Sequence, residues 1–196
     1  MRPDAVRLDL HALTRRKTVR KVTLTFGLIA GAIVSIFLGI GIALWEKSGI
    51  AIENALVGYA TMVIALSMVF FGIKSYRDNY QGGKIRFWKG FQVGLLITLI
   101  ASFMYAITWE TYNQVSPSSS AAFIDYYARC QIDKLKEKGV SAAEIDREVK
   151  KMDDFKRMYG NPAIRFGMTL IEILPVGIII TLISAAVLRK KEFLPA

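Results

Sequence analysis

Four long apolar stretches restrict this chain to a narrow set of folds. Three of them carry no charged residue and cover residues 22–45, 54–73 and 90–109. The fourth covers residues 166–188 and contains a single acid, Glu172. A helix rises 1.5 Å per residue, so about 20 apolar residues cross a hydrocarbon core that is about 30 Å thick. The sequence therefore predicts an all-α integral membrane protein with four transmembrane helices.

The pattern within the stretches disfavours a soluble helical bundle. A helix of a soluble protein shows a polar stripe at 3.6-residue spacing, and these stretches lack one. The three tryptophans, Trp45, Trp88 and Trp109, all lie where a stretch begins or ends. Indole rings prefer the membrane interface, where the ring is buried and the N–H is hydrated. The tryptophan positions therefore support the membrane prediction.

Basic residues are divided unequally between the two sides of the predicted membrane. The tail at residues 1–21 carries seven Lys and Arg, the connection at 74–89 carries five, and the tail at 189–196 carries three. The connection at 46–53, on the other side, carries only Lys47. Positively charged short segments stay in the cytoplasm. Both termini are therefore predicted to be cytoplasmic.

The net charge of +10 follows from this topology. Basic segments next to a membrane attract anionic lipid headgroups, so the bilayer is the partner that the charge predicts at the cytoplasmic face. A nucleic-acid partner is not expected, because no recognised binding motif accompanies the charge.

The segment at residues 110–165 is the one that resembles ordinary water-soluble helix, and it is predicted to form an extracytoplasmic helical hairpin. Ser141 and Glu144 have capping-box spacing, and the second helix is expected to run to about Tyr159. Further start and stop signals follow the rules for helix ends: Gly139 as a Schellman stop, then Asn161 and Pro162 before the fourth span. Two roles remain open, a lid over the outer end of the bundle and a module that binds a partner.

Glu172 and Pro175 are candidate functional residues of the fourth stretch. An ionisable group within a span is costly, and by default it suggests proton relay or ion coordination. Three structural alternatives stay open: Glu172 snorkels, pairs with Arg165, or is stabilised by the amino end of its own helix. Pro175 lacks an N–H to donate to Ile171, which predicts a kink.

Two pairs of glycines have the four-residue spacing that lets helix backbones approach closely, Gly27 with Gly31 and Gly90 with Gly94. Small residues occur throughout the first stretch. The pairs are therefore interpreted as tight packing within the chain rather than as a dedicated dimer face.

Residue counts disfavour several enzyme classes. The chain has one histidine, His11, and one cysteine, Cys130, so a zinc-ligand cluster is not expected. No aspartate lies within a span, which excludes an intramembrane aspartyl dyad. Gly82 and Gly83 precede a lysine but lack the full Walker spacing, and they read better as a basic turn at the lipid surface. No catalytic constellation and no cofactor are expected.

Two motifs resemble a known family. Residues 70–102 read FFGIKSYRDNYQGGKIRFWKGFQVGLLITLIAS, and residues 171–191 read IEILPVGIIITLISAAVLRKK. With FGLIAGAIVSI from Phe26, they resemble the bacterial membrane family catalogued as domain of unknown function 4199. The resemblance covers residues 22–191 and implies a multipass protein of the bacterial inner membrane with no established activity. It supplies no catalytic residue, and its motif positions add four candidate functional residues: Arg77, Asp78, Gly82 and Gly83.

Three functions are compatible with this reading. The leading hypothesis is a non-enzymatic membrane protein that acts through protein or lipid contacts, as a homo-oligomer or with a membrane protein partner. The rival is a small transporter or channel component that uses Glu172 near the kink at Pro175. A membrane enzyme acting on lipid headgroups is the third.

Overall fold

The computed structural model describes residues 3–48 and 55–189, and every regular element within them is a helix. The all-α prediction is therefore confirmed. The helices are α1 (Pro3–Ser48), α2 (Ala55–Leu66), α3 (Met68–Tyr80), α4 (Phe87–Val115), α5 (Pro117–Glu137), α6 (Ala142–Tyr159) and α7 (Pro162–Leu188). Residues 49–54, which include Glu53 of the first connection, and the basic pair Lys190 and Lys191 lie outside the described residues.

Within the described residues, four helical segments are long and apolar enough to cross a membrane. They cover Lys17–Ser48, Val57–Tyr80, Phe87–Val115 and Pro162–Leu188. The second segment consists of α2 and α3, which are separated only by Ser67. Because Ser67 keeps helical backbone angles, φ −57° and ψ −24°, and its N–H donates to the carbonyl of Val63, the chain continues from α2 into α3 without reversing its direction. The segments extend beyond the apolar stretches, since polar residues at the ends continue the helices.

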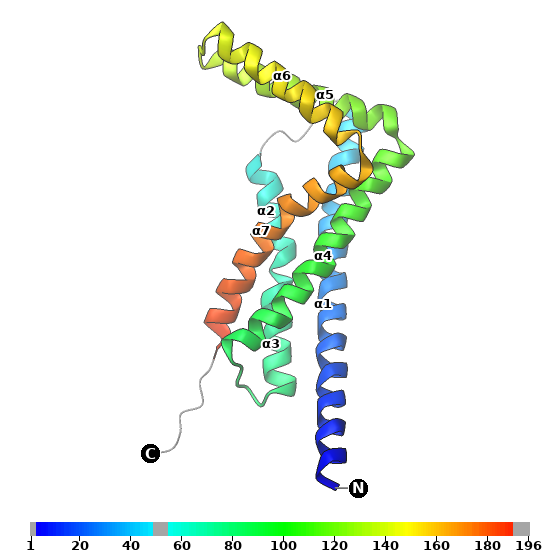
Figure 1. Cartoon of the computed structure of the whole chain (residues 1–196), viewed down its shortest axis with the longest axis vertical. Coiled ribbons are helices and arrows are strands. Elements are labelled where there is room, and N and C mark those ends of the chain that lie inside the picture. Colours follow the sequence, from blue (N-terminus) through cyan, green and yellow to red (C-terminus); the bar gives the residue numbers. More distant parts are fainter. Residues whose placement is uncertain (1–2, 49–54, 190–196) are drawn as a thin grey trace.

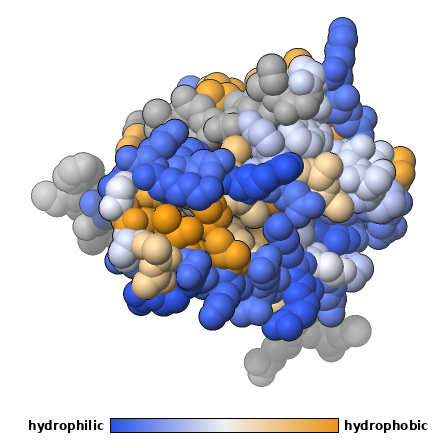
Figure 2. Space-filling model, turned by 90° about the horizontal axis from the view of Figure 1, so that it is seen from above, coloured by the Kyte–Doolittle hydropathy of each residue, from blue (hydrophilic) through white to orange (hydrophobic). Residues whose placement is uncertain are grey.

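The spanning helices form a bundle, with α5 and α6 lying across one end of it (Figure 1). The start of α1, the turn between α3 and α4, and the end of α7 all lie at the opposite end. We call this the basic end, since it carries exposed lysines and arginines of these segments: Lys17, Arg20, Lys21, Lys74, Lys84, Arg86 and Arg189. Seen from the α5–α6 end, the surface is largely hydrophilic with a hydrophobic area in its middle (Figure 2).

The interior of the bundle is filled by apolar side chains from α1, α2, α3, α4 and α7. Its fully buried members include Leu66, Val69, Ile73, Tyr76, Val93, Ile97 and Ile173. Large apolar side chains also cover the outside, with Ile36 63% exposed and Val187 68% exposed. Helices that are apolar on all sides belong in the core of a large protein or in a membrane. For a chain of this size, the pattern supports a membrane.

Glycines and small polar residues bring the spanning helices close together. A Cβ atom at Gly31 would lie against the Met104 side chain, and one at Gly94 would lie 2.7 Å from Thr181 Cγ2. Next to Gly94, the hydroxyls of Thr98 and Thr181 are 3.1 Å apart and hydrogen-bonded. These contacts join α4 to α1 and α7, so the interpretation of the glycine pairs as packing within the chain is confirmed.

The ends of α5, α6 and α7 follow the predicted signals. Gly139 has φ +67°, and the hydrogen bonds of the Schellman stop are present: its N–H donates to Lys136 O (2.9 Å), and that of Val140 to Leu135 O (3.5 Å). Ser141 and Glu144 form the complete capping box. Before α7, the Asn161 side chain accepts the Ala163 N–H at 3.0 Å. All three predictions are confirmed.

Candidate functional site

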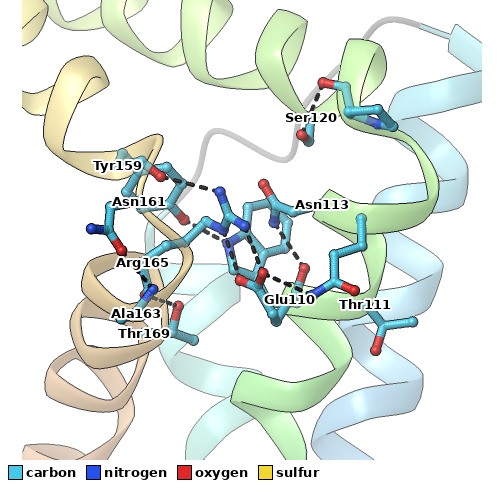
Figure 3. A network of polar contacts seen from close by, with 12 residues as sticks. Glu110, Thr111, Asn113, Ser120, Tyr159, Asn161, Ala163, Arg165 and Thr169 are labelled. Atoms are coloured by element: carbon cyan, nitrogen blue, oxygen red, sulfur yellow. Dashed lines mark hydrogen bonds and ion pairs between the residues drawn. The ribbon is translucent and has the colours of Figure 1, made fainter.

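A partly buried ion pair joins α4 to α7 where the two helices meet α6. Arg165 Nε donates to Glu110 Oε2 at 2.8 Å, and Arg165 Nη2 donates to Glu110 Oε1 at 2.7 Å (Figure 3). The two side chains are only 10% and 15% exposed. A bidentate arginine–carboxylate pair fixes geometry as well as contributing energy. This pair therefore sets the distance between α4 and α7 at the α5–α6 end.

Tyr159, the last residue of α6, links this pair to the aromatic residues around it. Its carbonyl accepts from Arg165 Nη1 at 3.1 Å, and its hydroxyl accepts from Trp109 Nε1. The Arg165 guanidinium lies 5.9 Å from the centre of the Tyr159 ring. Burial raises the pKa of the Tyr159 hydroxyl, and the charge of Glu172 acts in the same direction. The hydroxyl therefore stays protonated at physiological pH. Through its contacts with Trp109 and Arg165, Tyr159 connects α6 to both α4 and α7.

A second set of contacts holds α5 to α1. Trp45 Nε1 donates to Ser119 O at 3.3 Å, and the Trp45 ring packs edge-on against Phe123 with centroids 5.4 Å apart. Phe123 also contacts Trp109, at 5.7 Å between centroids. Two of the tryptophans expected at a membrane interface thus meet on one phenylalanine of α5. We call Trp45, Trp109, Phe123, Tyr159 and Arg165 with its partner Glu110 the outer clamp.

Glu172 does not pair with Arg165, so that sequence alternative is wrong. The guanidinium is occupied by Glu110 and by the Tyr159 carbonyl. Glu172 is exposed, and among the described residues nothing forms a hydrogen bond or ion pair with its carboxylate. Its neighbour Pro175 is also exposed and lies inside α7, which continues through it as helix. Glu172 therefore does not line the filled interior of the bundle.

Arg77, Asp78, Gly82 and Gly83 lie together at the basic end. Arg77 Nε donates to Asp78 Oδ1 at 2.6 Å, and its Nη1 donates to the carbonyl of Leu188, the last residue of α7, at 3.5 Å. A cation is favourable at a helix carboxyl end. Arg77 therefore connects the end of α3 to the end of α7.

The two glycines shape the turn that follows α3. Both have left-handed backbone angles, with φ +58° at Gly82 and +78° at Gly83, which glycine adopts without steric cost. The Gly83 N–H donates back to the Arg77 carbonyl at 3.1 Å. The motif thus builds a compact turn from α3 to α4, and it presents Lys84 to solvent.

The candidate residues therefore form two separate regions. The structure brings Arg77, Asp78, Gly82 and Gly83 together, and it places Glu172 and Pro175 apart from them, in α7. Sequence reasoning missed the outer clamp as a unit. Its signal was present, because Glu110 directly follows one apolar stretch and Arg165 directly precedes the next. Within the described residues, no group of three or more His, Cys, Asp and Glu side chains is placed to hold a metal ion.

The helices and their packing define a helical protein with four candidate membrane spans. The chain matches the model of a protein family of unknown function, DUF4199, over residues 25–190, and it belongs to that family. Comparisons with curated proteins and with solved structures found no match.

Proposed function

We propose that this protein crosses the bacterial inner membrane four times, with both termini in the cytoplasm, and acts as a non-enzymatic scaffold through contacts with other proteins and with lipid. The filled interior is the observation that carries this proposal. Side chains from α4 occupy the space against α1 and α7, as at Gly31 against Met104 and at Gly177 against Thr98. A packed bundle offers its surfaces, rather than its interior, for function.

The distribution of charge supports the orientation. Exposed lysines and arginines gather at the basic end, where the start of α1, the turn before α4 and the end of α7 meet (Figure 1). The cytoplasmic side of a multipass protein carries this excess in its short segments. The α5–α6 end, which carries mixed charges, then faces outward.

The α5–α6 pair combines both roles considered for it. Its root is held on the bundle by the outer clamp, as a lid would be. Its tip, the turn between α5 and α6, projects past the bundle (Figure 1). On α6, Val149 is 40% exposed, although it belongs to the apolar face of an otherwise charged helix. We assign a structural role to the part of α5 and α6 that the outer clamp holds on the bundle. We assign contact with a partner protein to the part near the turn between the two helices, which includes Val149.

Purification in mild detergent tests this proposal. The wild-type protein is expected to carry a companion protein that mass spectrometry identifies, and Val149→Glu is expected to lose it. Lys150→Glu is the matched control, because Lys150 is also exposed but lies off the apolar face; it should keep the companion. A monomer without companions, or equal loss in both variants, would contradict the partner role.

The structure does not favour the transporter alternative. Glu172 is exposed on the surface of α7 and is not one of the side chains that fill the interior. Flux in reconstituted vesicles, compared between wild type and Glu172→Gln, tests the alternative directly. The scaffold proposal expects no flux in either sample, and flux that depends on Glu172 would overturn it.

A further inference from the structure

A shallow, widely open surface groove of about 480 Å³ lies between α1 and α3 near the basic end. Its apolar half is lined by Phe26 of α1 and by Met68 and Phe71 of α3. Its polar half is lined by Lys74, Ser75, Asp78 and Asn79, all from α3. The groove therefore has an apolar part and a polar part, and we call the polar part, formed by Lys74, Ser75, Asp78 and Asn79, its mouth.

The two halves are ordered along the axis of α3. Met68 and Phe71 precede Lys74 by six and three residues, or about 9 and 4.5 Å at helical rise. In a membrane-spanning helix with this orientation, Met68 and Phe71 lie in the hydrocarbon region and Lys74 lies near the headgroups. The order of residues thus matches the order of acyl chain and headgroup in an inner-leaflet lipid.

Charge selects the kind of lipid. Lys74 is exposed, and nothing in the described part of the chain forms an ion pair with it. The carboxylate at the mouth, Asp78, is bound by Arg77 at 2.6 Å, which compensates its negative charge. Next to it, Asn79 donates to Ser75 Oγ at 3.1 Å, so both are neutral hydrogen-bonding groups. The mouth therefore presents one uncompensated cation.

We propose that this groove binds one anionic phospholipid of the inner leaflet, with the phosphate on Lys74 and an acyl chain along Phe26, Met68 and Phe71. A zwitterionic lipid fits the apolar wall equally well but has no net charge for the lysine to attract. The inference rests on the proposed membrane topology, and it gives the lipid contact of that proposal a defined place.

Native mass spectrometry of the detergent-purified protein, mixed with phosphatidylglycerol or with phosphatidylcholine, tests the site. Wild type is expected to retain one phosphatidylglycerol and to prefer it over phosphatidylcholine. Lys74→Gln should weaken this binding about fivefold, the effect of one basic residue at a lipid surface. Lys84→Gln removes the same charge from the exposed turn outside the groove, and it should bind as wild type does.

Two further measurements distinguish a site that binds a whole lipid from a site that binds only a phosphate group. Phe71→Ala, at a side chain that is 47% exposed and outside the core, should also weaken retention of the lipid. An excess of inorganic phosphate should not displace it, because phosphate lacks the acyl chain. Displacement by phosphate, or unchanged binding in Phe71→Ala, would overturn the groove as a lipid site.

The outcomes also distinguish this inference from the proposed function. A protein that stays dissolved without detergent would contradict the membrane proposal itself. A protein that requires detergent but loses phosphatidylglycerol equally in Lys74→Gln and Lys84→Gln would overturn only the groove, because the attraction would then belong to the whole basic surface.

Discussion

At the scale of single residues, stability at the α5–α6 end depends on the pair Glu110–Arg165. Glu110→Gln leaves the buried guanidinium without its counter-charge, and breaking such a pair costs about 3 kcal/mol. We expect that decrease in the free energy of unfolding, measured by titration with a denaturing detergent. Gln114→Ala is the control, since Gln114 is exposed and donates to Glu110 at 3.2 Å. Equal effects of the two substitutions would show that the pair is not a stabilising contact.

Gly177 tests close packing at the same scale. A Cβ atom there would clash with Thr98 Cγ2, so Gly177→Ala forces α7 away from α4, and overpacking of this kind costs about 1–3 kcal/mol. Gly41→Ala serves as the control, because a Cβ at Gly41 would meet no atom within 4 Å. The same titration should show a loss for Gly177→Ala only. A tolerated alanine at Gly177 would contradict the close contact of α4 and α7.

At the scale of elements, the capping box fixes where α6 begins. Ser141→Ala removes the side-chain acceptor of the Glu144 N–H, a bond of 3.3 Å, and should destabilise the first turn of α6 by about 1 kcal/mol. Faster hydrogen exchange at the Glu144 amide measures this. Ser116 precedes α5 without a side-chain cap bond, so Ser116→Ala should leave exchange in α5 unchanged. Unaltered exchange at Glu144 would show that the box contributes nothing to α6.

Local sequence signals predicted the elements better than their contacts. Apolar runs marked the spanning helices, and Gly139 and Asn161 marked helix ends, because these signals act between neighbouring residues. The sequence placed Glu110 and Arg165 at the ends of two apolar stretches, but it did not show that these two residues pair, since they lie 55 residues apart in the chain. Glu172, only two turns from Arg165, was the nearer choice by sequence. The packing of α4 against α7 decides which acid pairs with Arg165. The sequence pattern does not show how far apart two helices lie, so it could not decide between Glu110 and Glu172.

At the scale of the whole molecule, the basic end and the α5–α6 end should lie on opposite sides of the membrane. Replacing Cys130, the only cysteine, with serine leaves a chain without thiols. A new cysteine is then placed in α5 as Lys134→Cys or in the turn after α3 as Lys84→Cys, both at exposed positions. A membrane-impermeant maleimide added to cells with an opened outer membrane should label the α5 cysteine alone. Labelling of the turn cysteine should require disruption of the inner membrane as well, since four spans place it inside with both termini. Labelling of both cysteines before that disruption would refute the four-span arrangement, and labelling of the turn cysteine alone would invert it.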